Sequence, residues 1–378
     1  MFGIINTIMR IGILTQPLRT NYGGLLQALA LQTVLTRLGH EAMILNRCYT
    51  NALDSLVTRM LRVKNILIGR DVVCKDENKI SKAEEKISKF IQNRYKLTDS
   101  IYTTEDLKKC VEKEKLNAIV VGSDQVWRPR YSPNIFNYFL DFLDSKAVKR
   151  YSYAASFGVD AWEYSQDETE RCSRLAQLFD GITVRESSAV ELCKENLGVK
   201  AEHVLDPTLL LSAQDYMDLI STDIEKSSGE LFTYILDSGA EKDTIIEMIA
   251  KATNHKPFAC MPKLKLTYKN ARKNLEDCKI PAVEQWIQSF VDANMVVTDS
   301  FHGTVFSIIF NKPFWVVANP QRGNTRMESL LAVFDLKDRM VTEENIANKD
   351  LNAPIDWEKV NSIKKDWQKK SMEFLKNI

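Results

Sequence analysis

Residues 11–45 read IGILTQPLRTNYGGLLQALALQTVLTRLGHEAMIL, and this stretch decides the fold class. An apolar run over 11–15 predicts a strand, and a polar loop with two glycines follows it. Over 25–38 the apolar residues recur at the three- and four-residue spacing of a helix, which ends at Gly39. Residues 42–45 predict a second strand. A strand, a helix and a strand in this order form a right-handed crossover, which indicates a parallel sheet.

The alternation of strands and helices continues along the chain in two series. In the first, strands are predicted at 118–121, 150–155, 182–184 and 201–205, with helices at 165–179 and 187–196. The pattern breaks at Asp206-Pro207, and a polar stretch at 222–229 follows. In the second, strands are predicted at 231–236, 257–261, 295–298 and 314–317, with helices at 242–252, 281–293, 303–310 and 326–334.

The two series predict an α/β fold of two Rossmann-like domains that face a cleft. For 378 residues, two domains are the natural expectation. We expect an N-terminal domain over 9–222, a C-terminal domain over 223–350, and a last segment, 351–378, whose helix packs back on the N-terminal domain. Ligands of such folds bind where the carboxyl ends of the strands meet the cleft.

Composition argues against several classes of protein. The 51 basic and 50 acidic residues nearly cancel, so a general nucleic-acid partner is not expected. The seven cysteines form no Cys-x-x-Cys pair and no cluster with histidine, which predicts reduced thiols and no metal site. No segment reaches the roughly 20 apolar residues that span a bilayer, and residues 1–9 lack the basic start of a signal peptide. We therefore expect a cytoplasmic protein.

One histidine, His302, lies at a strand-to-helix junction in VVTDSFHGT, residues 296–304. A helix N-terminus offers unpaired N–H groups and partial positive charge to an anion. An imidazole beside a bound anion is well suited to transfer a proton. Ser300 and Gly303 could supply hydroxyl and N–H contacts to the same anion; the alternative is an ordinary helix cap.

Six segments together resemble the polysaccharide pyruvyl transferase family. They occur in the family's order over about residues 10–335: Asn21-Tyr22-Gly23-Gly24 with Gln27 and Ala28, VGSDQVW at 121–127, YAASFG at 153–158, VRE at 184–186, VLDPT at 204–208 and TDSFHG at 298–303. The resemblance implies a fold similar to the GT-B glycosyltransferases. It also implies transfer of a pyruvyl group from phosphoenolpyruvate to a sugar as a cyclic ketal, in making capsule, exopolysaccharide or cell-wall glycan.

By this resemblance, the arginine that contacts phosphoenolpyruvate falls on Arg185 and the catalytic histidine on His302. The donor is a small trianion, and holding it needs guanidinium groups and backbone N–H groups. Arg185 follows the strand predicted at 182–184, where a ligand-facing side chain is expected; a salt bridge to Glu186 or Glu191 is the alternative. His302 would act as a general acid that protonates the enol methylene, so that a sugar hydroxyl attacks C2.

The sequence departs from the family pattern at one position. Many members carry an Arg-Leu or similar pair before the histidine, where this chain has Ser300 and Phe301. One cation for the donor is thus absent there. Arg322 and Arg326, which precede a predicted helix, could replace it; solvated surface side chains are the alternative.

Asn21, Gly23 and Gly24 open the first helix and are candidates for substrate binding. Glycines there would let the backbone approach a ligand closely. The segment lacks the GxGxxG pattern and the P-loop lysine, so it gives weak support for a dinucleotide or ATP site. A plain turn with a helix cap explains the same residues.

Four more residues follow buried strands and are candidates for contact with the acceptor. Asp124, Gln125 and Trp127 could hold a sugar ring, unless Trp127 fills the core. Asp206 could orient an arginine or act as a base toward the acceptor hydroxyl, although an Asp-Pro turn is the commoner role.

The expected partners are phosphoenolpyruvate and a glycan acceptor, with no further cofactor. Residues 56–70 carry apolar side chains on one helical face and basic side chains mostly elsewhere. Such a helix could lie on an anionic membrane surface, which would suit a lipid-linked acceptor at the inner face of the membrane. A helix that faces the core with a solvated rim has the same pattern.

Two other functions remain open at this stage. A GT-B glycosyltransferase with a nucleotide-sugar donor would share the architecture, although the second series shows no clear signature of a base pocket or of ribose-binding carboxylates. A glycan-binding scaffold without catalysis would not depend on His302. Catalysis by His302 predicts a loss of about 10²–10⁴-fold when this residue is replaced.

Overall fold

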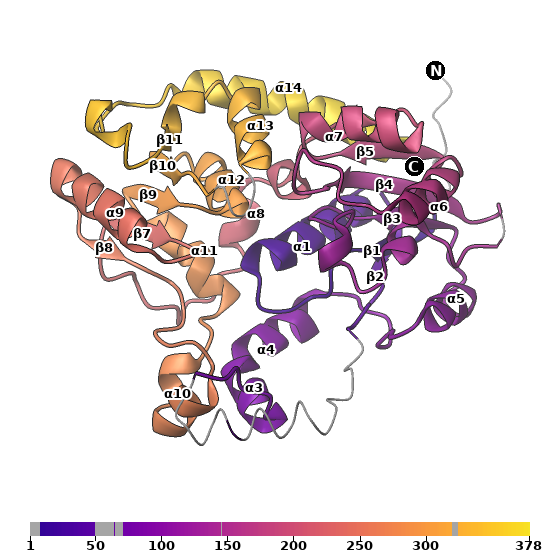
Figure 1. Cartoon of the computed structure of the whole chain (residues 1–378), viewed down its shortest axis with the longest axis horizontal. Helices are drawn as coiled ribbons and strands as arrows, with labels where there is room; N and C mark the ends of the chain where they lie inside the picture. Colours follow the sequence, from indigo (N-terminus) through magenta and orange to yellow (C-terminus); the bar gives the residue numbers. More distant parts are fainter. Residues whose placement is uncertain (1–7, 50–63, 65–70, 145, 320–323) are drawn as a thin grey trace.

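The computed structural model describes residues 8–49, 64, 71–144, 146–319 and 324–378. Within these ranges the chain forms two parallel β-sheets with helices packed against their faces (Figure 1). The predicted α/β fold class is confirmed.

The first sheet has six parallel strands in the order β2–β1–β3–β4–β5–β6. Helices cover both of its faces, so its central strands are buried over most of their length rather than alternating, and β3 is buried at every position. The strand bounds are Arg10–Leu14 (β1), Glu41–Ile44 (β2), Ala118–Val121 (β3), Lys149–Ala155 (β4), Gly181–Val184 (β5) and Glu202–His203 (β6).

The second sheet has five parallel strands in the order β11–β10–β9–β7–β8. The edge strands β6 and β8 are shorter than the sequence predicted, because an edge strand has a hydrogen-bonding partner on one side only. The short strand β11 was not predicted. The bounds are Leu231–Tyr234 (β7), Pro257–Phe258 (β8), Met295–Thr298 (β9), Phe314–Val317 (β10) and Met340–Val341 (β11).

Helices connect the strands of both sheets. The helix predicted at 187–196 ends early as α7 and continues as a π-helical turn, Cys193–Leu197. In the N-terminal half the helices are Tyr22–Arg37 (α1), Glu77–Ala83 (α3), Glu85–Arg94 (α4), Thr104–Lys113 (α5), Gln166–Ala176 (α6), Ser187–Leu192 (α7) and Ala213–Met217 (α8). Those that follow are Ala240–Thr253 (α9), Tyr268–Lys273 (α10), Val283–Asp292 (α11), Phe301–Ile309 (α12), Thr325–Val333 (α13) and Trp357–Lys376 (α14).

Helix α1 packs against both halves, which explains why its sequence is apolar around most of its circumference. Its first residue, Tyr22, stacks on Trp286 of α11 with 5.5 Å between the ring centroids. The hydroxyl of Tyr22 donates a hydrogen bond to the carbonyl of Pro281 (2.9 Å). The first helix of the N-terminal half is therefore also part of the boundary between the halves.

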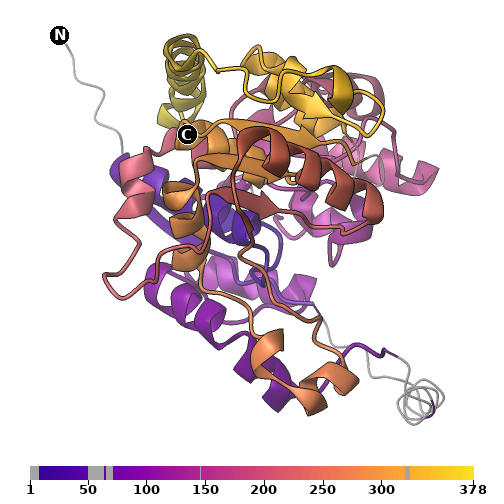
Figure 2. The same ribbon diagram turned by 90° about the vertical axis from the view of Figure 1, so that its left-hand side faces the viewer.

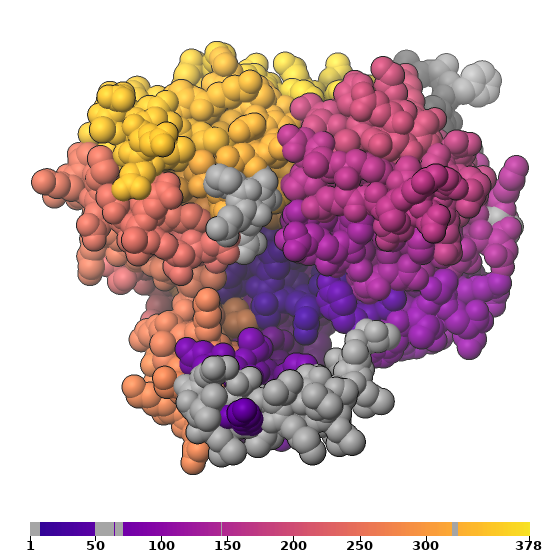
Figure 3. Space-filling model, in the orientation of Figure 1, coloured from indigo at the N-terminus to yellow at the C-terminus, as the bar shows by residue number. Residues whose placement is uncertain are grey.

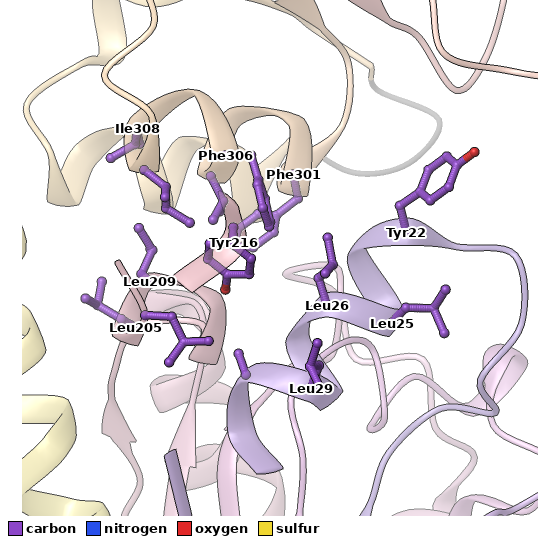
Figure 4. Close-up of a cluster of buried hydrophobic side chains, with 14 of the residues drawn as sticks. Tyr22, Leu25, Leu26, Leu29, Leu205, Leu209, Tyr216, Phe301, Phe306 and Ile308 are labelled. Carbon is purple, nitrogen blue, oxygen red and sulfur yellow. The ribbon is translucent and has the colours of Figure 1, made fainter. Parts of the chain in front are cut away.

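One hydrophobic core runs through both halves of the molecule. Figure 4 shows the part of it where α1 and the segment after β6 meet α12. Tyr216 packs edge-to-face on Phe306 with 4.7 Å between centroids, and Leu205 and Leu209 lie in the same cluster. Because this boundary is packed like an interior, it fixes how the ends of the two sheets face each other.

A second contact between the halves lies away from the sheets. Helix α10 is beside α3 in both ribbon views (Figures 1 and 2). The N–H of Tyr268 donates to the carbonyl of Val72, and the N–H of Ile280 donates to that of Ala83 (both 2.9 Å). Between the halves a hollow remains, with the indigo segment that leads into α1 at its base (Figure 3).

Helix α14 lies against the first sheet and the segment that follows it. The N–H of Leu205 donates to Ser371 Oγ (3.0 Å), and Gln368 Nε2 donates to the carbonyl of Leu209 (2.5 Å). Trp367 packs edge-on against His203 with 4.9 Å between centroids. The last helix thus braces residues that come directly after β6.

In the described part of the chain, no helix combines the length and the apolar character needed to cross a membrane. The amphipathic helix predicted at 56–70 lies outside the described residues, apart from Lys64.

We expect Phe306→Ala to destabilise the protein by about 3–5 kcal/mol, because it opens a cavity in the core that both halves share. Urea unfolding would measure this loss. The control is Leu178→Ala, at a side chain that is 45% exposed, which should change the free energy of unfolding by about 0.5 kcal/mol or less. Equal effects of the two substitutions would contradict a shared core.

His203 should make stability depend on pH. Burial lowers its pKa to about 4, from an ordinary value of about 6.5. As the pH falls, His203 therefore binds a proton in the unfolded chain before it does so in the folded protein. Its contribution to the free energy of unfolding keeps its full value above about pH 6.5 and is lost between about pH 6.5 and 4. Between pH 7 and 5, wild type should lose about 1–2 kcal/mol more than His203→Gln in urea unfolding. If the free energy of unfolding changed with pH by the same amount in wild type and in His203→Gln, this role of His203 would be ruled out.

Candidate active site

The pocket at the boundary has walls from both halves and about 620 Å³ of empty space, part of it open to solvent. It lies at the carboxyl ends of the parallel strands, as expected for this fold class. From the N-terminal half it is lined by Asn21, Asp124 and Gln125, and from the C-terminal half by Leu236, Asp299, Ser300, Phe301, His302, Val316, Val317, Asn319, Asn324, Arg326 and Met327.

His302 lies in the first turn of α12, directly after the end of β9. The side chain of Ser300 caps this helix by accepting from the N–H of Gly303 (3.4 Å). The imidazole is 6% exposed and borders the pocket. Its Nε2 lies 3.6 Å from Oδ2 of Asp206 and makes no hydrogen bond to a described residue. This nitrogen is itself buried and is directed toward the carboxylate.

Asp206 is a fully buried carboxylate behind His302. Its Oδ2 accepts from Ser123 Oγ (2.8 Å) and from Nη1 of Arg185 (3.0 Å), and its Oδ1 accepts from the hydroxyl of Thr208 (2.6 Å). Burial alone would raise the pKa of this carboxyl, but His302 and Arg185 hold it well below its usual range. Asp206 does not line the pocket, so the predicted contact with substrate is not observed; the other predicted role, orienting an arginine, agrees with its bond to Arg185.

Arg185 follows β5 and is also buried, with a side chain that is 1% exposed. Its guanidinium carbon lies 4.3 Å from the centre of the Phe301 ring, which separates it from the pocket, and its Nη2 is 3.6 Å from Asp124 Oδ1. Burial lowers the pKa of Arg185, but the carboxylates of Asp206 and Asp124 more than offset this and the pKa is raised. The ligand-facing position predicted for Arg185 is therefore not observed. Its ion-pair partner is Asp206, not Glu186 or Glu191.

Arg326, at the start of α13, is the guanidinium that lines the pocket. Its Nε donates to the carbonyl of Gly158 (3.2 Å). Burial, and then the neighbouring charge of Arg185, lower the pKa of Arg326 to about 10. The loop that carries Gly158 is held by Glu186, whose Oε1 accepts from the N–H groups of Phe157 (2.9 Å) and Gly158 (3.3 Å). The second predicted cation, Arg322, lies outside the described residues.

Three residues predicted from the N-terminal half do line the pocket. Asp124 and Gln125 come directly after the buried strand β3 and its glycine, and Asn21 caps α1 by accepting from Gly24 N–H (3.2 Å). Gln125 Oε1 accepts from Nη1 of Arg128 (3.2 Å), which fixes the side chain at the edge of the pocket. These side chains form the part of the pocket lining that the N-terminal half contributes.

Trp127 is a core residue, and the prediction that it holds a sugar is wrong. The indole is fully buried, stacks on Phe139 with 5.1 Å between centroids, and donates its N–H to the carbonyl of Tyr138 (2.9 Å). No face of the ring is left for a ligand.

The glycines of the predicted site also have structural roles. A Cβ on Gly23 would lie 2.1 Å from Nδ1 of His302, so this glycine makes room for the imidazole rather than for a ligand. A Cβ on Gly303 would lie 2.2 Å from the hydroxyl of Thr298. The N–H groups of Gly303 and Gly24 are used by the caps of their helices.

Sequence reasoning missed Asp299 and Asn319, which line the pocket from the C-terminal half. The buried carboxylate of Asp299 accepts from Lys242 Nζ (2.6 Å), Asn319 Nδ2 (3.1 Å) and the N–H of Leu236 (2.7 Å). Both residues follow buried strands, β9 and β10, which is the signal that identified Asp124. Among the described residues, no group of three or more His, Cys, Asp or Glu side chains could hold a metal ion.

Comparison with known proteins identifies the family. The sequence pattern of the polysaccharide pyruvyl transferase family matches residues 21–321. The chain belongs to this family. The match covers His302, Arg185, Asp206 and the pocket residues up to Asn319, whereas Asn324, Arg326 and Met327 lie beyond its end. A comparison with curated protein sequences finds no match.

Solved structures resemble this pyruvyl transferase family member over nearly its whole length. UDP-GlcNAc 2-epimerase from Methanocaldococcus jannaschii is 12% identical, with a TM-score of 0.53, over 97% of this chain and 99% of that one. S. aureus MnaA, in a co-structure with UDP, is 14% identical, with a TM-score of 0.50, over 94% and 91%. Medicago truncatula UGT71G1 complexed with UDP-glucose is 12% identical, with a TM-score of 0.49, over 99% of each chain. At these identities the likeness shows the fold alone.

We expect Gly23→Ala to displace His302, because the added methyl group would overlap the imidazole. The imidazole NMR signals of the four histidines would report this, since only that of His302 should shift strongly. The control is Gly239→Ala, at an extended position with no atom within 4 Å of the added carbon, which should leave all four signals in place. An unchanged His302 signal in Gly23→Ala would contradict the contact.

Proposed function

We propose that this enzyme transfers a pyruvyl group from phosphoenolpyruvate to two hydroxyls of a glycan precursor, forming a cyclic ketal and releasing phosphate. The observation that carries the proposal is the pairing of His302 with a buried carboxylate, Asp206, at a pocket that also holds the guanidinium of Arg326. The combination supplies a proton donor and a cation on the same side of one pocket.

The donor is an anion with a carboxylate and a phosphate. Arg326 offers a planar fork of donors that suits either group. It takes the role of the cation that is absent at position 300, where Ser300 caps α12 instead. Arg185 adds positive potential from behind Phe301 and holds Asp206 in place.

His302 is the general acid in this proposal. It protonates the methylene carbon, and C2 becomes an oxocarbenium-like centre that a sugar hydroxyl attacks. Phosphate then leaves with the electrons of its bond to C2, and a second hydroxyl closes the ring. Of the two hydroxyl protons, one restores His302 and the other leaves on hydrogen phosphate. Asp206 stabilises the imidazolium form without taking the proton.

Asp124 is the base we propose for the first hydroxyl, and it passes this proton on to the departing phosphate. It lines the pocket from the N-terminal half; its Oδ1 accepts from the N–H of Gln125 (2.9 Å) and lies 3.6 Å from Nη2 of Arg185. Asp299 also lines the pocket, but it already accepts from Lys242, Asn319 and backbone N–H groups. The donor is a metabolite of the cytoplasm, so the proposed reaction belongs there, and a lipid-linked acceptor would bring it to the inner face of the membrane.

Thermal unfolding tests the donor, since it needs no acceptor. Phosphoenolpyruvate at ten times its Kd should stabilise the protein by about 1.4 kcal/mol, a shift in Tm of roughly 1–3 °C. Arg326→Gln should abolish the shift, and Arg272→Gln, at an exposed arginine on α10, should keep it. A shift with UDP-glucose but none with phosphoenolpyruvate would favour glycosyl transfer from a nucleotide sugar and overturn the proposal.

Replacement of His302 tests the chemical step. In His302→Ala, the shift with phosphoenolpyruvate should persist, while phosphate release with a membrane extract as the source of acceptor should fall by about 10²–10⁴-fold. Unchanged phosphate release in His302→Ala would contradict the role of general acid and favour a scaffold in which another protein performs the reaction.

A further inference from the structure

Three exposed tyrosines gather on one part of the N-terminal half. Tyr49, Tyr102 and Tyr131 are 41%, 46% and 39% exposed. Among the described residues these are the aromatic side chains exposed by more than about a third, and they come from three separate segments of the sequence. Exposed aromatic side chains that cluster in this way commonly mark a binding surface.

Hydrogen bonds hold the three segments together. The hydroxyl of Tyr49 donates to the carbonyl of Tyr131 (2.7 Å). The buried guanidinium of Arg47 donates from Nη1 to the carbonyls of Cys48 (2.5 Å) and Tyr102 (2.7 Å). The backbone under the rings is thus fixed before any ligand arrives, which lowers the entropy cost of binding.

Two exposed arginines add positive charge to this surface. The guanidinium of Arg19 lies 5.7 Å from the ring centre of Tyr49, and that of Arg130 lies 5.9 Å from the ring centre of Tyr131. Both arginines are exposed, and neither has an ion-pair partner in the described part of the chain. Arg128, 4.8 Å from the Tyr131 ring, is different, because it is buried and bonded through two nitrogens to Glu163.

The surface adjoins the pocket. Ser132, next to Tyr131, donates to the carbonyl of Val126 (2.7 Å). Gln16 Nε2 donates both to Ser132 Oγ (3.1 Å) and to the carbonyl of Gln125 (2.9 Å). Gln125 lines the pocket. Gln16, through its two hydrogen bonds, therefore connects the segment that carries Tyr131 to the pocket lining.

We infer that this surface, the tyrosine ledge (Tyr49, Tyr102, Tyr131, Arg19 and Arg130), binds the sugars of the acceptor beyond the one that receives the pyruvyl group, and that this glycan carries carboxylate or phosphate groups. The inference rests on the proposed function, because it makes the ledge an extension of the acceptor site. The C–H face of a pyranose ring can pack against the exposed part of a tyrosine ring. The guanidinium forks of Arg19 and Arg130 match carboxylate and phosphate groups.

Isothermal titration with two oligosaccharides of equal length tests the ledge: hexagalacturonic acid, which has a carboxylate on every ring, and neutral maltohexaose. Wild type should bind the anionic hexamer at least about tenfold more tightly. Arg130→Glu should remove most of that difference, and Tyr131→Leu, which keeps apolar bulk but loses the ring, should weaken binding of both hexamers. The matched control is Arg272→Glu, at an exposed arginine on α10 with no ion pair to a described residue, which should bind as wild type does. All four proteins should unfold at similar temperatures.

The outcomes separate this inference from the proposed function. Three results would overturn the inference about the ledge. They are equal affinity for the two hexamers, binding of neither hexamer, and equal effects of Arg130→Glu and Arg272→Glu. Equally tight binding of a DNA duplex would also overturn it, since the surface would then attract any polyanion. The shift with phosphoenolpyruvate should persist in Arg130→Glu. If that shift is missing from wild type while hexamer binding still depends on Arg130, the donor assignment fails and the ledge stands as a glycan-binding surface.

Discussion

The buried ion pair between Asp206 and Arg185, with His302 at its other side, is the interaction on which the site depends. A carboxylate without water is stable only when its oxygens are fully bonded, and Ser123 and Thr208 complete its contacts. Arg185 follows β5 of the first sheet, and His302 lies in the first turn of α12, which follows β9 of the second sheet. One anion thus joins the two halves at the point where their ligand-binding edges meet.

The charges around the pocket nearly compensate one another. Arg185 and Arg326 contribute two positive charges, and Asp124, Asp206 and Glu186 contribute three negative ones when ionised. Protonation of His302 would bring this set to neutrality. Anion binding at this pocket therefore depends on the directed donors of Arg326 and not on a large excess of positive charge.

Much of the fold could be predicted from the sequence because buried parallel strands are short apolar runs with clear ends. The bounds expected for β3, β9 and β10 agree with the structure. The lengths of the edge strands were overestimated, because hydrophobicity does not reveal how many neighbours a strand has. For the site, the sequence indicated the histidine at a strand-to-helix turn and the polar residues after β3, and His302, Asp124 and Gln125 line the pocket. The roles of Trp127 and Gly23 could not be predicted, since they depend on contacts between distant segments: a ring that fills a core, and a missing side chain that leaves space for an imidazole.

The contacts of α14 have a consequence for the order in which the protein is made. Ser371 and Gln368 hydrogen-bond to Leu205 and Leu209, which stand on either side of Asp206 in the sequence. The strand, the arginine and the histidine of the site are all synthesised before this brace exists. On the ribosome, the segment that carries Asp206 therefore lacks its outer support until the final helix has emerged, so the surroundings of the pocket are completed last even though their residues are spread through the middle of the chain.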